Sequence, residues 1–107
     1  MERELLKGHS KLMILSTLAA EPMHGYALSQ KLRTEMPGMF AFGVGMLYPL
    51  LHALEKDEYI EGVWNTDGDV RKKIYQVTKK GKKELAHKKK EWRLFSQSLS
   101  GFIHLNP

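Results

Sequence analysis

Four leucines at helical spacing constrain the fold of this chain more than any other feature. They lie between Gly43 and Lys56 and recur at the spacing of one buried helix face: Leu47, Leu50, Leu51 and Leu54. Pro49 lies in the same stretch, and a proline inside a helix clashes with the carbonyl four residues earlier, here that of Gly45. The pattern therefore predicts a helix that begins irregularly, with Gly43 as its N-cap, and ends near residues 57–58.

The other faces of this helix carry side chains that are unusual for a solvated surface: Met46, Tyr48, Pro49, His52 and Ala53. A phenol and an imidazole, where Lys and Glu are common, indicate contact with another molecule. An ordinary amphipathic helix explains the same periodicity equally well. The first amides of a helix are unpaired and its dipole favours negative charge, so phosphate is the natural ligand for its start.

Two further helices are predicted before this one. The first spans residues 8–20, with an earlier turn over 2–6, and its inward stripe comprises Leu12, Leu15, Leu18 and Ala19, flanked by Ile14. The second spans residues 25–35 and directs three side chains inward: Ala27, Leu28 and Leu32. Gly25 should permit close helix approach, and His24 is interpreted as a partly buried, satisfied imidazole rather than as a ligand.

Glycines and a proline mark residues 36–45 as a loop. Three apolar side chains in this loop are expected to cap the core: Met39, Phe40 and Phe42. Because they alternate with smaller residues, a short strand is the alternative structure for this segment.

Two strands are predicted over residues 60–64 and 72–77, because both segments are rich in β-branched and aromatic residues. The connection between them contains the turn signal Asp67-Gly68 and is long enough to form a wing. Since the tip of this wing is acidic, phosphate contacts should come from the returning strand, through Arg71, Lys72 and Lys73.

A final helix is predicted over residues 79–103, with Thr78 as its N-cap. Its apolar residues follow a heptad spacing that Lys88 interrupts: Leu85, Trp92, Phe95, Leu99 and Phe102. These residues could pack within one chain, but so long a helix extends beyond a domain of this size. We therefore expect them to form a homodimer interface.

The charge of the chain is unevenly distributed. Residues 1–70 contain six Lys or Arg and ten Asp or Glu, whereas residues 71–107 contain eleven and two. A locally basic surface suits a polyanionic partner such as DNA, although a solvated face would show the same composition.

Several classes of protein are not expected. The chain has no cysteine, no apolar run long enough for a membrane span and no signal-peptide character at Met1. No catalytic motif and no metal-binding histidine spacing occur, so neither an enzyme nor a cofactor or metal site is predicted. These observations favour a cytoplasmic, non-membrane protein.

Four motifs, in order along the chain, resemble the PadR-type transcriptional regulators. They are Pro22-Met23-His24-Gly25-Tyr26-x-Leu28, Gly45-x-Leu47-Tyr48-Pro49-x-Leu51-His52-x-Leu54-Glu55, Arg71-Lys72-Lys73-x-Tyr75-x-Val77-Thr78-x-x-Gly81 and Glu91-Trp92-Arg93-x-Phe95-Ser96. The similarity extends from about residue 5 to residue 102.

The resemblance implies a mainly α fold, in which a winged helix-turn-helix DNA-binding domain (1–78) precedes a single C-terminal dimerisation helix (79–107). It also implies a regulator, usually a repressor, that binds a two-fold symmetric operator on double-stranded DNA as a homodimer. The implied DNA-binding residues are Gly45, Met46, Tyr48, Pro49, His52, Arg71, Lys72 and Lys73. The chain departs from the family pattern at Met46, where a hydroxyl residue is usual, at Ala53, where arginine is common, and at Glu58, where glycine is usual.

Two alternative functions are consistent with the sequence. The dimer interface could bind an aromatic small molecule between paired Trp92 side chains, which would make the protein a ligand sensor. The exposed apolar stripe could instead bind a different protein partner.

Overall fold

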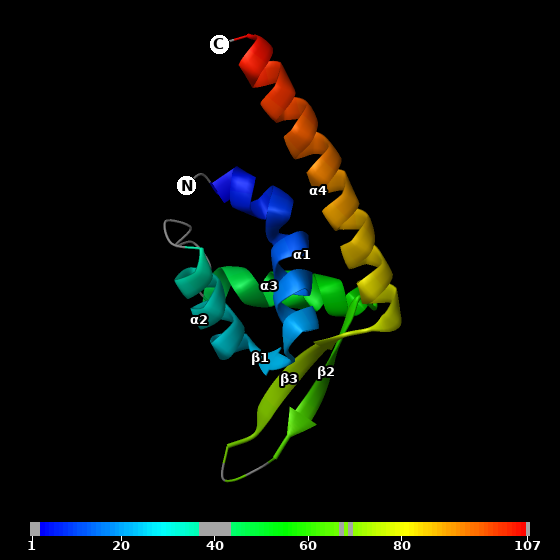
Figure 1. Ribbon diagram of the computed structural model, residues 1–107. Coiled ribbons are helices and arrows are strands. Elements are labelled where there is room, and N and C mark those ends of the chain that lie inside the picture. Colours follow the sequence, from blue (N-terminus) through cyan, green and yellow to red (C-terminus); the bar gives the residue numbers. More distant parts are fainter. Residues whose placement is uncertain (1–2, 37–43, 67, 69, 107) are drawn as a thin grey trace.

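A computed structural model describes residues 3–36, 44–66, 68 and 70–106 (Figure 1). In this part of the chain the elements follow in the order α1 (Arg3–Ala20), β1 (Met23–His24), α2 (Gly25–Glu35), α3 (Val44–Lys56), β2 (Ile60–Asn65), β3 (Lys72–Val77) and α4 (Lys79–Leu105). The mainly α fold with a β-wing and a long final helix is confirmed. The predictions for residues 37–43, including the N-cap Gly43 and the core-capping aromatic residues, lie outside the described residues.

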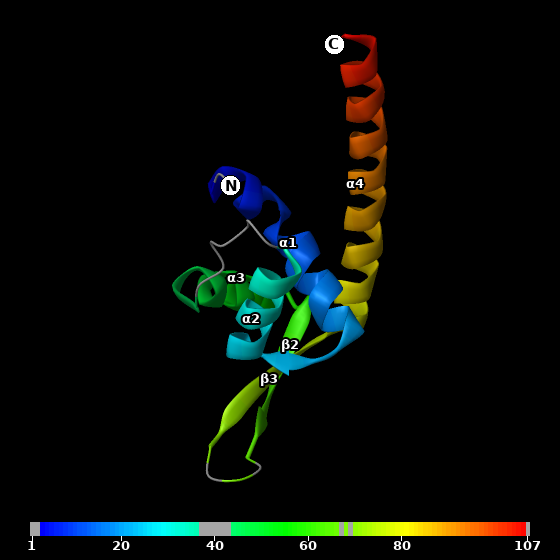
Figure 2. The same cartoon turned by 60° about the vertical axis from the view of Figure 1, so that its left-hand side comes forward.

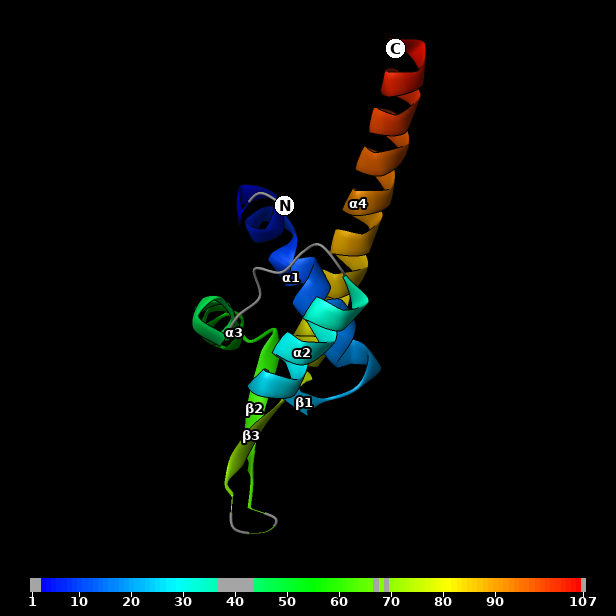
Figure 3. The same cartoon turned by 90° about the vertical axis from the view of Figure 1, so that its left-hand side faces the viewer.

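The core lies where α1, α2 and α3 meet the base of the sheet (Figures 1 and 3). Three of the predicted leucines of α3 are buried, and Leu50 is half-buried against them. In α1 the predicted stripe was wrong at one edge, because Ile14 is fully buried whereas Ala19 is exposed. Ile14 and Leu18 are one turn apart and both belong to the core, so the stripe is rotated toward Ile14.

The sheet has three strands in the order β1-β3-β2, all antiparallel. The two strands of the wing confirm the prediction, and Ile60 pairs with Val77 at its base while Asn65 pairs with Lys72 near its tip. The sequence did not predict β1. Its two residues pair with the middle strand and attach the start of α2 to the wing (Figure 2).

A Schellman motif ends α3. The amide of Tyr59 donates to the Leu54 carbonyl at 3.0 Å, the amide of Glu58 donates to the Glu55 carbonyl at 3.0 Å, and Glu58 has φ 64°. This left-handed conformation favours glycine, because a Cβ approaches the following carbonyl oxygen. A glutamate therefore occupies a position at which glycine is favoured.

The start of α4 is held against the end of α3. Thr78 caps α4 by accepting from the Gly81 amide at 3.0 Å, as predicted, and its own amide donates to the Tyr59 carbonyl at 3.1 Å. Gly81 lies so close to that carbonyl that any Cβ would overlap its oxygen. The chain therefore turns from β3 into α4 along one tightly fixed path.

The C-terminal half of α4 extends away from the rest of the molecule (Figures 1 and 2). Its apolar side chains are exposed, among them Trp92, Phe95, Leu99 and Phe102. Leu85 is different, since it is 7% exposed and belongs to the chain's own core. Leu85 is thus already buried within one chain, and its place in a dimer interface stays a prediction. No described helix is both long and apolar enough to cross a membrane.

Candidate nucleic-acid interface

A groove lies between the start of α2, the outer side of α3 and the face of the wing that follows it. Its lining brings together five of the eight predicted DNA-binding residues, namely Tyr48, His52, Arg71, Lys72 and Lys73. These residues come from two segments that are 19 positions apart in the sequence, from His52 to Arg71. The view along α3 shows this helix beside the wing, with α2 next to both (Figure 3).

Tyr48 occupies this groove because Gly25 leaves room for it. A Cβ at Gly25 would lie 2.9 Å from the phenol oxygen of Tyr48 and 3.0 Å from the adjacent ring carbon. The close approach predicted for Gly25 is thus confirmed, and its partner is the Tyr48 ring. The side chain of Tyr48 remains 39% exposed, and its ring centroid lies 6.4 Å from that of His52. The phenol is therefore fixed in position and still accessible.

His24 acts as the N-cap of α2. Its Nδ1 accepts a hydrogen bond from the Ala27 amide at 3.2 Å, which satisfies one of the unpaired amides of the helix start. The interpretation of His24 as a satisfied, partly buried imidazole is confirmed. Its ring also lines the groove, beside Tyr26.

The three basic residues of the wing have different environments. The guanidinium of Arg71 stacks over the Trp64 ring at 4.3 Å, and Lys72 is exposed at the wing's outer end. Lys73 instead forms an ion pair with Glu55 of α3 at 3.0 Å, and this hydrogen bond raises the pKa of Lys73. Two cations are therefore available to a ligand, whereas the third ties the wing to α3.

Gly62 makes the Lys73 position possible. Gly62 and Tyr75 are cross-strand partners, as are Trp64 and Lys73, so all four lie on the same face of the wing. A Cβ at Gly62 would overlap the Lys73 side chain. The glycine therefore lets the lysine stem cross the ribbon and reach Glu55. Burial raises the pKa of the neighbouring Tyr75, so its phenol stays neutral.

Three predicted site residues do not line the groove. Gly45 and Pro49 are exposed elsewhere on α3, and Met46 packs partly against the core. Sequence reasoning also missed lining residues, above all Trp64. The cross-strand register that places Trp64 opposite Lys73 was available from the two predicted strands, and it would have identified this aromatic residue.

A second groove lies between α1, α3 and α4. Its walls include Leu12, Leu50, Ala53, Trp92 and Phe95. His9 meets the Trp92 ring edge-on, with centroids 5.4 Å apart. Ala53 thus faces this groove rather than the wing.

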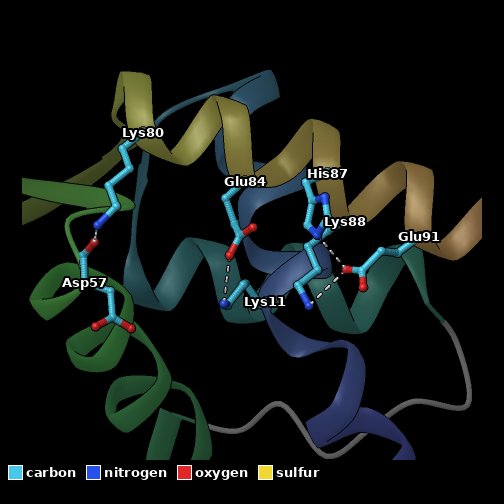
Figure 4. Close-up of polar contacts among 7 residues, drawn as sticks. All are labelled: Lys11, Asp57, Lys80, Glu84, His87, Lys88 and Glu91. Carbon is cyan, nitrogen blue, oxygen red and sulfur yellow. Dashed lines mark hydrogen bonds and ion pairs between the residues drawn. The ribbon is translucent and has the colours of Figure 1, made fainter.

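Polar contacts fix α4 along this second groove (Figure 4). Lys11 of α1 donates to Glu84 at 3.1 Å, and Lys80 donates to the Asp57 carbonyl at 2.8 Å. The Lys11 ammonium lowers the pKa of Glu84, and hydrogen bonding to Glu84 raises the pKa of Tyr59. Among the described residues, no cluster of three or more His, Asp or Glu side chains could hold a metal ion.

Three helices packed on a small antiparallel sheet, with β2 and β3 projecting as a wing beside α3, define a winged helix-turn-helix protein. The sequence pattern of the transcriptional regulator PadR-like family matches residues 14–87. The chain belongs to this family of transcriptional regulators.

Relatives resemble the chain over nearly its whole length. An uncharacterized protein of Lysinibacillus sphaericus is 31% identical over 102 residues, which cover 94% of this chain and 93% of that protein. A PadR-like transcriptional regulator from Bacillus cereus superimposes with a TM-score of 0.85 at 31% identity, covering 94% of this chain and 96% of that one. A transcriptional regulator from Clostridium thermocellum gives a TM-score of 0.85 at 25% identity, covering 96% and 98%.

Proposed function

We propose that this regulator binds a two-fold symmetric operator on double-stranded DNA as a homodimer and represses transcription there. One observation carries the proposal: the groove beside α3 brings Tyr48 and His52 together with Arg71 and Lys72. A phenol, an imidazole and two cations on one accessible surface suit phosphate oxygens and base edges.

The DNA contacts divide by chemistry. Arg71 and Lys72 would hold the phosphate backbone, and Tyr48 would donate from its fixed position to a phosphate near the start of α3. Between Val44 and Leu54, α3 carries no Lys or Arg, so it cannot read guanine with two hydrogen bonds from a cationic side chain. Specificity would then depend on His52 and on the shape of the DNA.

Selection of bound duplexes from a random pool tests the operator directly. It should return an inverted repeat whose half-sites are centred about one helical turn, roughly 34–36 Å, or a multiple of it apart. A reporter gene behind that repeat should be transcribed less when the protein is present. Recovery of a single asymmetric site would contradict the symmetric operator, and increased transcription would contradict repression.

The homodimer is supported by the exposed stripe on α4. Trp92 is 45% and Phe102 64% exposed in the single chain, and an apolar face of this kind is stabilised by burial on a second copy. Replacing Trp92 and Leu99 together with glutamate should yield monomers in sedimentation experiments. Leu94→Glu is the control, because Leu94 is also exposed, at 58%, but lies on another face of α4. A folded dimer of the double variant would contradict this interface.

A second candidate function is the sensing of an aromatic small molecule. The observation that favours it is the second groove, where Trp92, Phe95 and His9 surround an open apolar space. Binding should quench Trp92 fluorescence in a Trp64→Phe background and change DNA affinity. If aromatic ligands leave both signals unchanged, the groove has only a packing role.

A further inference from the structure

The outer face of α4 carries a cationic stripe that the groove beside α3 does not use. It consists of Lys79, Lys82, Lys83, Lys89, Lys90 and Arg93. All six are exposed, and none of them forms an ion pair with another described residue. At 1.5 Å per residue the stripe is about 20 Å long.

The acidic residues of α4 are placed away from this stripe. The helix contains only Glu84 and Glu91. Glu84 is bound to Lys11 of α1, and Glu91 lies between His87 and Lys88, so both are engaged on the side shown in Figure 4. Counting around the helix at 3.6 residues per turn places Lys83 and Lys90 about 80–120° away from these two glutamates, and Arg93 about 160–180° away. α4 itself therefore contributes no carboxylate to the stripe. Of the six cations, only Lys79 shares a groove with glutamates of another element, namely Glu55, Glu58 and Glu61.

This arrangement opposes the stability of the helix itself. Lys79, Lys80 and Lys82 lie at the N-terminal end of α4, where the helix dipole disfavours cations. Lys79 and Lys83, and likewise Lys89 and Arg93, are like charges four residues apart, a spacing at which they repel. An external polyanion would relieve both effects.

We infer that this stripe binds the phosphate backbone of a duplex DNA segment other than the one held beside α3. Most of the stripe lies on the side of α4 opposite the buried Gly81 and Leu85, whereas the groove is lined by α2, α3 and the wing, so the two surfaces can hold separate duplex segments. Such binding would be independent of base sequence, since the lysines would contact phosphate oxygens and not base edges.

The composition of the stripe distinguishes DNA from other anionic partners. Protein interfaces are enriched in aromatic residues and depleted in lysine at their centres, and this stripe has five lysines and no aromatic residue. Membrane-bound helices insert an apolar face next to their cations. Most exposed apolar residues of α4, among them Trp92, Phe95 and Leu99, lie on the other side, in the proposed dimer interface, and Leu94 alone does not form an apolar face beside the cations.

The test uses the full-length chain in a background that lacks the groove contacts, Tyr48→Ala/Arg71→Ala/Lys72→Ala. Into it are introduced either the stripe substitutions Lys83→Gln/Lys90→Gln/Arg93→Gln or the control substitutions Lys31→Gln/Arg33→Gln/Lys56→Gln. Both sets remove three positive charges, and glutamine has a helix propensity close to that of lysine. Circular dichroism checks that the helices are retained. The probe is a random-sequence duplex of about two helical turns, titrated at several salt concentrations.

We expect the groove variant to retain salt-dependent binding to this duplex. The stripe substitutions should lower the slope of log affinity against log salt by about two to three, since each phosphate contact contributes about 0.9. The control substitutions should leave that slope nearly unchanged. A groove variant without any DNA binding, or equal effects of the two sets, would overturn the inference. The inference would also be overturned if the stripe substitutions reduced binding only to phosphatidylserine vesicles, or only to polyglutamate, and not to the duplex.

The same experiment separates this inference from the proposed function. If the groove substitutions alone leave DNA affinity at the wild-type value, the groove is not the DNA interface. The comparison between stripe and control substitutions then still decides whether α4 binds DNA.

Discussion

The ammonium group of Lys73 lies 3.0 Å from the carboxylate of Glu55, and this ion pair joins the returning strand of the wing to the last turns of α3. Both side chains are 26% exposed, so solvent screening weakens the ion pair but does not abolish it. Together with the pairing of β1 and β3, this ion pair helps to set the angle between the wing and α3 (Figure 3). Lys73 is thus a positioning residue in a surface where Arg71 and Lys72 are free to contact DNA.

The first prediction separates positioning from phosphate contact. Arg71→Ala and Lys72→Ala should each lower the salt slope of DNA binding by about one. Glu55→Gln removes a negative charge and frees Lys73, so it would strengthen DNA binding if Lys73 acted on phosphate. We expect Glu55→Gln to weaken DNA binding instead, and Lys73→Gln to do the same, because either change breaks the ion pair between the wing and α3. Affinities of Glu55→Gln and Lys73→Gln that change in opposite directions would contradict the positioning role.

The second prediction concerns the Tyr48 hydroxyl. A hydrogen bond to a charged group contributes about 1.5–3 kcal/mol, so Tyr48→Phe should weaken binding to specific and random DNA alike by at least about tenfold. The melting temperature should hardly change, because the ring stays against Gly25. Tyr26→Phe is the control, since that hydroxyl lines the same groove but accepts from Gln30 at 2.7 Å. Unchanged binding of Tyr48→Phe would assign Tyr48 a packing role only.

The third prediction follows from the left-handed conformation of Glu58. Glycine adopts this conformation without the Cβ penalty of about 1–2 kcal/mol, although it loses more backbone entropy on folding. Glu58→Gly should therefore raise the free energy of unfolding by roughly 0.5–1 kcal/mol, or a few degrees in melting temperature. Glu58→Ala should give no such gain, because alanine has the same Cβ. Equal stabilities of the glycine and alanine variants would show that this turn is not strained.

The fourth prediction is a pH dependence that originates at Glu84. Its pKa in the folded chain lies below the ordinary 4.5, chiefly because Lys11 donates to it. A lowered folded pKa contributes stability above the unfolded pKa, and this contribution is lost as the pH falls through the folded value. In urea unfolding, the wild type should lose stability more steeply below about pH 4.5 than Glu84→Gln does. Parallel pH profiles would contradict the Lys11–Glu84 contact.

The sequence predicted the elements of the fold well because each has a local signal. Helical leucine spacing located α3, Thr78 located the start of α4, and β-branched residues located the wing strands to within one residue. The strand β1 has no such signal. It has only two residues, and its existence depends on pairing with Tyr75 and Ile74, which are about fifty positions away.

The candidate site was predicted less completely, for a related reason. Apolar spacing shows that a side chain must be buried, but it does not identify the partner that buries it. Leu85 and Trp92 occupy equivalent heptad positions, yet Leu85 is 7% exposed and belongs to the core, whereas Trp92 is 45% exposed. Similarly, a run of three basic residues gives no sign that Lys73 meets Glu55, because that contact crosses between two elements.

The junction at Tyr59 has a consequence for how operator length is determined. The Tyr59 carbonyl accepts from Thr78 and lies against Gly81, while Lys80 donates to Asp57, so α3 and α4 meet at a joint with almost no freedom. In the proposed homodimer, the two α4 helices then act as rigid arms that fix the distance between the two α3 helices. A shift of one α4 helix along the other by one helical turn displaces the two α3 helices relative to each other by about 5.4 Å, which is more than one base-pair step. Changes far along α4 would thereby retune which operator spacing the protein accepts, without altering any residue that touches DNA.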